Sequence, residues 1–185
     1  MFGNDPRLLA AVYEALRKAL LLSPEEGAGR IFRAYADPPP PQVNRDMDLC
    51  FYHLTPDAAA PMLREQMLRN GRWAVFRFIP CRLFLVFYGN AAETWALRAR
   101  ENLFTDGADA PRGLLRKAGL YLLPPVSPPA VLREEEGSLY RRRADLTLDA
   151  RLADNSDAPG SASGEMEAPT VEIIPEISLQ TLDQR

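Results

Sequence analysis

Histidine, cysteine and catalytic motifs are scarce in this sequence of 185 residues. It has one histidine, His53, and two cysteines, Cys50 and Cys81. It contains no H-x-x-x-H, no C-x-x-C, no serine or cysteine nucleophile motif and no glycine-rich phosphate loop. Because metal sites, covalent catalysis and nucleotide binding each depend on such patterns, the sequence predicts neither an enzyme nor a protein with a metal or cofactor.

The two cysteines and the histidine all lie in apolar runs that are typical of strands. Thiols in such runs are typical of reduced, buried side chains in a cytosolic protein rather than of a disulfide framework. His53 stands between Tyr52 and Leu54, and we interpret it as a histidine of the core or its rim.

Long apolar runs are also missing. No run reaches the roughly 18 residues that a membrane span needs. Near the start of the sequence, Asp5 and Pro6 stand where a signal peptide would have a positively charged and then an apolar segment. We therefore expect a protein that has no membrane partner and is made in a cytoplasm.

The charge balance is slightly acidic. A formal charge of -3 and a pI near 5.3 argue against a general nucleic-acid binder, although the run Arg141 to Arg143 leaves room for a local basic patch. Asp145 and Asp149 alternate with arginines on one side of a strand, and Glu172 and Glu176 lie on the wet side of another. Such carboxylates are typical of surface ion pairs rather than of acid and base catalysts, which need burial or close pairing.

The order of the expected helices and strands predicts one α+β domain over residues 1–185. The fold class is a mixed, mainly antiparallel sheet flanked by two to three helices, with a long C-terminal β-hairpin. The expected helices are residues 6–22, 90–104 (opened by a capping box) and 111–119. The expected strands are 30–36, 47–55, 72–80, 81–89, a short one within 120–129, 139–153 and 169–181. The strand 30–36 is expected at an edge of the sheet, whereas 72–80 and 81–89 are expected at its centre, as a hairpin or as one bent strand. Residues 56–71 are predicted to be a loop with a helical turn. Residues 134–137 are either a solvated turn or a docking surface.

The last two strands carry the main hypothesis about assembly. Residues 139–153 would span roughly 50 Å at about 3.3 Å per residue, whereas a compact core of this size is about 35 to 40 Å across. A flexible acidic loop at 154–168 is expected to connect them to residues 169–181, which would form the partner strand of a hairpin. The surplus length suggests pairing with a neighbouring copy, and a head-to-tail contact of that kind gives a cyclic homo-oligomer.

Several segments together resemble a known family. The segments are "FIPCRLFLVFYGNAAETWALRAREN", "LLRKAGLYLLPP" and "RRRADLTLDARL" leading to "VEIIPEISLQ", and the similarity covers roughly residues 5–182. They are similar to the neck or tail-terminator proteins of long-tailed phages. The resemblance implies a structural virion protein that is assembled in the host cytoplasm and forms a ring, usually a hexamer, on the last ring of the tail tube.

The resemblance also implies partners. These are the tail tube protein, the head-completion or connector proteins and, in a contractile tail, the sheath protein, while DNA passes through the lumen without specific binding. It implies no catalytic residues and no cofactor. The expected subunit and tube contacts are Arg141, Arg143, Asp145, Asp149, Arg151, Glu172 and Glu176. An adaptor or stopper on the portal side, and a nucleic-acid-binding accessory protein, remain alternatives. The proline run at 38–41 and the loop at 154–168 depart from the family's pattern.

Overall fold

The computed structural model describes residues 5–36, 47–57, 59–61, 63–69, 72–124, 126–136 and 139–154. They form an α+β fold, as the sequence predicts. The elements are α1 (Pro6–Ala19), α2 (Pro24–Ala28), β1 (Ile31–Arg33), β2 (Leu49–Pro56), β3 (Leu63–Arg69), β4 (Arg72–Tyr88), α3 (Ala92–Asn102), α4 (Pro111–Lys117), β5 (Leu120–Leu122), β6 (Ala130–Glu136) and β7 (Leu139–Asp154).

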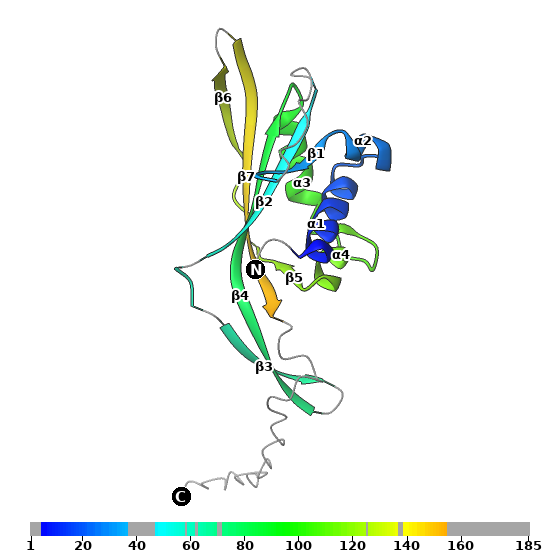
Figure 1. Ribbon diagram of the computed structural model, residues 1–185, viewed down its shortest axis with the longest axis vertical. Helices are drawn as coiled ribbons and strands as arrows, with labels where there is room; N and C mark the ends of the chain where they lie inside the picture. Colours follow the sequence, from blue (N-terminus) through cyan, green and yellow to red (C-terminus); the bar gives the residue numbers. More distant parts are fainter. Residues whose placement is uncertain are drawn as a thin grey trace, which may run out of the picture.

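The described strands form one mixed sheet. Its central order is β1-β2-β4-β7-β5, while β3 adds to β4 and β6 adds to β7, for seven strands in the described residues. Only the β1–β2 pair is parallel, and the other pairs are antiparallel. The four helices lie on the same side of this sheet (Figure 1). The predictions that β1 is an edge strand and that β4 is central are confirmed.

β4 is a single strand of 17 residues rather than a hairpin. Pro80 is tolerated in its middle because the neighbours on one side change there. β2 pairs with β4 up to Cys81, and β3 pairs with it up to Phe78. The Pro80 carbonyl accepts a hydrogen bond of 2.9 Å from the Asp57 amide on that side. The missing N–H of the proline therefore falls where no strand needs it.

β7 has 16 residues, and its length is shared among three partners. It pairs with β4 over 143–154, with β6 over 139–145 and with β5 over 150–152. Beyond Arg143, only β6 continues beside it, and at the other end Arg72–Phe76 of β4 pair only with β3. The sheet therefore projects at both ends as two-stranded arms (Figure 1). We call residues 130–136 and 139–145 the β6–β7 arm.

The described residues contain a hairpin formed by β6 and β7, and the expected pairing of 139–153 with 169–181 stays a prediction. β6 is the strand that turns into β7, whereas the expected partner at 169–181 and most of the loop at 154–168 lie outside the described residues. Both edges of β7 are already occupied over 143–145 and over 150–152.

Several local features differ from what the sequence predicts. Within residues 56–71 the chain forms strand β3, not the predicted helical turn. Residues 134–136 belong to β6 rather than to a solvated turn, and the alternative of a docking surface stays a prediction. In the described residues, the three longer helices α1, α3 and α4 agree with the prediction, and a capping box of Ser23 and Glu26 opens the additional short α2. At α3 the expected capping box is absent, and the Ala91 amide instead donates to Asp48 Oδ1 at 2.7 Å. A residue distant in sequence has replaced the local cap.

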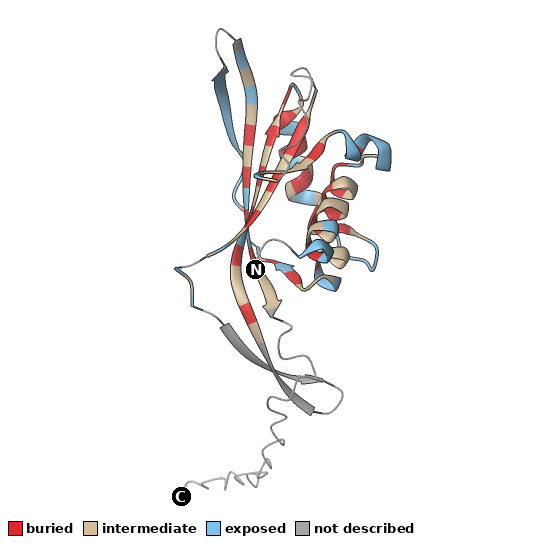
Figure 2. Ribbon diagram, in the orientation of Figure 1, coloured by how far each residue is buried: buried red, intermediate tan, exposed pale blue. Residues whose placement is uncertain are grey.

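The core lies between the helices and the sheet (Figure 2). Helix α1 buries one face, with Leu8, Val12 and Leu16 at helical spacing. Strand residues facing the helices alternate with residues that face away, as a period of two requires. The buried strand residues on the helix side include Cys50, Tyr52, Leu54, Cys81, Leu83, Leu85, Phe87, Ala144, Leu146, Leu148 and Ala150. Burial raises the pKa of the Cys50 and Cys81 thiols, the latter to about 12, and both are free and buried, as the sequence predicts.

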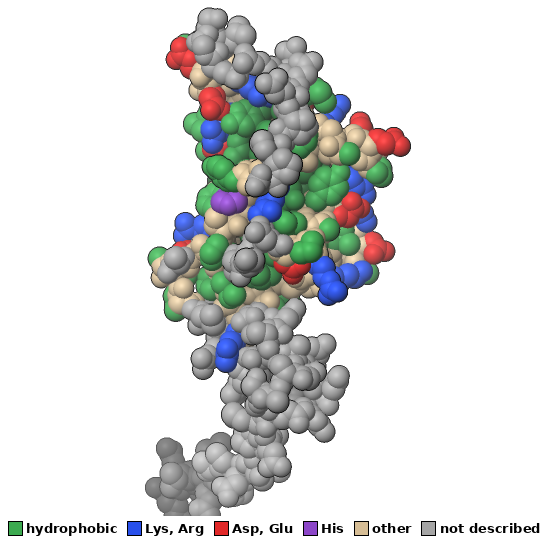
Figure 3. Space-filling model, viewed as in Figure 1, with side chains coloured by type: hydrophobic (Ala, Val, Ile, Leu, Met, Phe, Trp, Pro, Cys, Tyr) green, Lys and Arg blue, Asp and Glu red, His purple; other side chains and the backbone are tan. Residues whose placement is uncertain are grey.

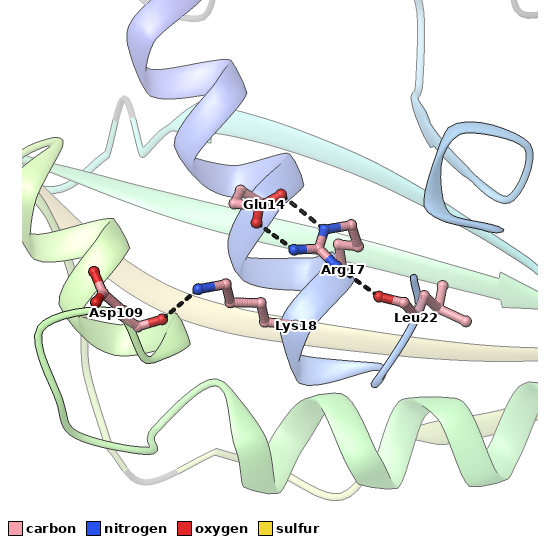
Figure 4. A network of polar contacts seen from close by, with 5 residues as sticks. All are labelled: Glu14, Arg17, Lys18, Leu22 and Asp109. Carbon is pink, nitrogen blue, oxygen red and sulfur yellow. Dashed lines mark hydrogen bonds and ion pairs between the residues drawn. The ribbon is translucent and has the colours of Figure 1, made fainter. Parts of the chain in front are cut away.

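Polar contacts hold the helix layer together (Figure 4). The Arg17 guanidinium donates to the Glu14 carboxylate, with Nε at 2.8 Å, and its Nη1 donates to the Leu22 carbonyl at 2.7 Å. The hydrogen bond from Arg17 holds the pKa of the Glu14 carboxyl below its usual value. Lys18 Nζ donates to the Asp109 carbonyl at 2.8 Å, which ties α1 to the loop before α4. These contacts connect α1 to the segments that follow it and precede α4.

Candidate functional site

The side of the sheet that faces away from the helices is the candidate site. On β4, Phe84, Val86 and Tyr88 point to this side and are partly buried, while their neighbours point to the core. No helix among the described residues covers this side (Figures 1 and 2). We call it the uncovered face. Its described residues are Phe51, His53, Thr55, Arg82, Phe84, Val86, Tyr88, Arg141, Arg143, Asp145, Thr147, Asp149 and Arg151.

One half of the uncovered face is aromatic. The Phe51 ring lies 5.8 Å from that of Phe32 and 5.9 Å from that of Tyr88, between ring centroids. Beside them, His53 contacts Tyr35 edge-on at 5.1 Å and stacks near Phe84 at 6.5 Å. The space-filling view shows hydrophobic side chains reaching the surface among charged ones (Figure 3). His53 is thus a rim histidine in an aromatic cluster, as the sequence predicts.

The other half of the face is charged and lies on β7. Arg143 and Asp145 form a bidentate ion pair, with Nε to Oδ1 at 2.7 Å and Nη2 to Oδ2 at 2.9 Å. Arg143 Nη1 also lies 3.4 Å from a carboxylate oxygen of Glu134 on β6. The hydrogen bond to Asp145 is the main reason that the pKa of Arg143 is raised. Burial raises the pKa of Tyr88, which lies beneath these groups.

Arg141 is held differently from Arg143. Its guanidinium carbon lies 4.7 Å above the centre of the Tyr88 ring, a cation–π contact. Its Nε and Nη2 atoms are buried and have no hydrogen-bond partner among the described groups. In Arg143, the corresponding Nε and Nη2 atoms bind Asp145. Burial of these two donors without partners therefore lowers the stability of the isolated chain.

Replacing Arg141 with methionine should leave the stability unchanged or raise it by up to about 1 kcal/mol. The change removes two unsatisfied donors, and a long apolar side chain still covers Tyr88. Arg143→Met, two residues away on the same face, should cost about 1–2 kcal/mol because it leaves Asp145 unpaired. Urea unfolding of both variants measures the difference. A loss of more than 1 kcal/mol for Arg141→Met would contradict this account.

The far end of the uncovered face is open and polar. Arg82 binds Asp57 at 2.8 Å and lies 3.5 Å from Asp149. An open depression of about 240 Å³ lies next to it between β5 and β6. The residues that line this depression are Ser127, Pro128, Ala130, Asp145, Thr147 and Asp149. Arg151 lies farther along β7, opposite Pro80 in the register.

The structure brings five of the seven predicted contact residues together on one face. Arg141, Arg143, Asp145, Asp149 and Arg151 all alternate onto the uncovered face of β7, as the sequence predicts. Their role as subunit contacts stays a prediction. The other two, Glu172 and Glu176, lie outside the described residues.

Sequence reasoning missed the aromatic half of the face. Phe84 and Tyr88 belong to a run that is predicted to be a central strand, and Phe51 belongs to the strand predicted over 47–55. The available signal was that these runs are apolar at both odd and even positions, which is typical of strands covered on both faces. Helices cover one face in the described residues, so the runs indicate a second covering surface.

Among the described residues, no three acidic, histidine or cysteine side chains come together in a group that could hold a metal ion. None of the described helices has both the length and the apolar character to cross a membrane.

Comparison with known proteins found no family model and no curated protein that matches the chain.

Proposed function

We propose that this chain is a tail-terminator protein of a long-tailed phage. Copies of it would form a ring that caps the tail tube, ends tube polymerisation and offers a docking surface for head-tail joining. The observation that carries the proposal is the uncovered face: from Leu83 to Tyr88, β4 is apolar on both faces, and Phe51 of β2 adds to the aromatic surface, whereas the described helices cover only one face. A sheet with such strands requires a second cover, and neighbouring protein subunits would supply it.

The composition of the uncovered face supports a protein partner. Aromatic rings and arginines are the side chains most enriched in protein–protein interfaces. The arginines alternate with carboxylates, and Arg143 is already neutralised by Asp145. A face of mixed sign gives DNA phosphates little attraction. Contact with subunits of the ring or of the tube fits this chemistry better than contact with nucleic acid.

The two arms support assembly through strands. At each end of the sheet a two-stranded ribbon extends beyond the core (Figure 1). Strands of this kind have one edge whose backbone groups can accept a neighbour, while charges limit unspecific sheet growth. A subunit with projecting ribbons at both ends is suited to head-to-tail contacts around a ring, expected to be sixfold.

Tails assembled without this chain test the proposal. We expect overlong tails in negative-stain images, because nothing would stop the tube, and normal lengths again when the wild-type chain is supplied. Tails of normal length without heads would contradict a terminator and favour the portal-side adaptor or stopper. Salt-sensitive DNA binding by the purified chain, with tails unchanged, would favour an accessory nucleic-acid-binding protein.

A pair of variants connects this test to the uncovered face. Val86→Asp places a carboxylate in the middle of that face, and we expect it to fail to restore the tail length. Ala108→Asp places the same charge in the exposed loop before α4 and should restore it. Equal rescue by both variants would show that the uncovered face is not the contact surface.

A further inference from the structure

The β6–β7 arm has a second face, on the helix side of the sheet, with an unusual charge arrangement. Arg133 on β6 lies directly opposite Arg142 on β7, and both are exposed. Like charges directly opposite each other on a sheet destabilise the strand pair. Glu135 shares this face, but within the described residues no ion pair joins it to either arginine. Among the described residues, no carboxylate forms an ion pair with either guanidinium group that would relieve their repulsion.

Apolar and aromatic surface surrounds the two arginines. Val131, which is 54% exposed, precedes Arg133 on the same face, and Tyr140, which is 72% exposed, lies next to Arg142. Tyrosine, arginine and an exposed aliphatic side chain are typical of the centre of a protein interface. We call Val131, Arg133, Tyr140 and Arg142 the arm patch.

The outer face of α3 has the complementary chemistry. Glu93, Leu97 and Glu101 follow each other at intervals of four residues, so they lie along one side of the helix. All three are exposed, Leu97 by 39%. Neither glutamate forms an ion pair with a described residue. The arginines of α3 do not neutralise them, because Arg98 donates to the Leu20 carbonyl and Arg100 to the Val126 carbonyl.

We propose that the arm patch of one copy binds the outer face of α3 in a second copy. Arg133 and Arg142 would pair with Glu93 and Glu101, and Val131 and Tyr140 would pack around Leu97. Arginine forks match carboxylates in a bidentate geometry, which fixes orientation as well as affinity. The inference rests on the proposed function, since it names the contact through which neighbouring subunits of the ring would join.

The two patches are different surfaces of one chain. Each copy therefore has one arm patch and one α3 face. The contact between them is head-to-tail, and such a contact closes into a ring when the rotation between subunits permits it. Nucleic acid is a poorer occupant of the arm patch. The arm carries four arginines, three glutamates and Asp145, so its formal net charge is zero.

Charge reversal tests the contact. In the arm variant, Arg133→Glu and Arg142→Glu are combined, and in the helix variant, Glu93→Arg and Glu101→Arg are combined. Each variant alone would set like charges against each other, and we expect at least a tenfold loss of self-association by mass photometry. An equimolar mixture should assemble again, because each arm then meets a helix of opposite charge. A chain with all four changes should also assemble.

All four positions are exposed, and circular dichroism and thermal unfolding of each variant verify that it folds. Assembly of both variants like the wild type would overturn the proposed contact. So would loss of assembly without recovery in the mixture, or DNA binding that the arm variant alone abolishes. The proposed function is tested separately: if both variants keep assembling and still restore the tail length, the ring stands and only this contact fails. A wild-type chain that neither assembles nor restores the tail length would contradict both.

Discussion

Phe87→Ala should lower the free energy of unfolding by about 3–5 kcal/mol, the range for a large aromatic side chain removed from a closed core. Phe87 has no exposed surface and points from β4 toward the helices. Phe84, three residues earlier on the same strand, points to the uncovered face and is only partly buried. Phe84→Ala should therefore cost much less, about 1 kcal/mol, because solvent or neighbouring rings can fill the space.

The two variants should also separate folding from assembly. Urea unfolding measures the stability of each, and mass photometry measures its self-association. We expect Phe84→Ala to fold but to assemble weakly, since it removes the ring that stacks near His53 in the aromatic half of the face. Equal losses of stability in the two variants would mean that a permanent cover lies over Phe84 within the chain. An unchanged assembly of Phe84→Ala would argue against the uncovered face as an interface.

The alternation of β7 is the part of the candidate site that the sequence predicts best. The five predicted contact residues between Arg141 and Arg151 fall on one face because the side chains of a strand have a strict period of two. The partners of β7 could not be predicted. Glutamates have a low strand propensity, so residues 134–136 resemble a turn, yet the register places Glu134 opposite Arg141. Cross-strand neighbours, which are not visible locally, make this segment a strand.

The same limit applies to β3 and β4. Leu63, Met67 and Leu68 fit a helical spacing as well as a strand, and pairing with β4 decides the outcome. For β4, the sequence left open whether Pro80 marks a corner. The answer depends on β2 ending and β3 starting at that point, which is a property of the whole sheet. Periodicity identifies faces, whereas pairing decides which segments are strands.

Gly89→Ala should lower the free energy of unfolding by about 2–4 kcal/mol. Gly89 directly follows β4 and has a φ of 110°, a backbone conformation that residues with a side chain rarely adopt. A Cβ atom there would lie 2.4 Å from Asp48 Oδ1 and 2.8 Å from Asp48 Cα. The Asp48 carboxylate also accepts from the Ala91 amide at the start of α3. Backbone strain, overlap and loss of this helix cap therefore act together.

A second glycine provides the matched control. Gly29 has a φ of -96°, and a Cβ there would meet no atom closer than 4.0 Å, so Gly29→Ala should be neutral or slightly stabilising. Asp48→Ala alone should cost about 1 kcal/mol through the lost cap. The double variant Gly89→Ala with Asp48→Ala should recover only part of the loss, because the overlap with the Asp48 backbone and the strain at residue 89 persist. Thermal and urea unfolding of the four chains measure this cycle. Full recovery in the double variant would show that the Asp48 side chain is the only obstacle, and a harmless Gly89→Ala would show that the end of β4 can move away from Asp48.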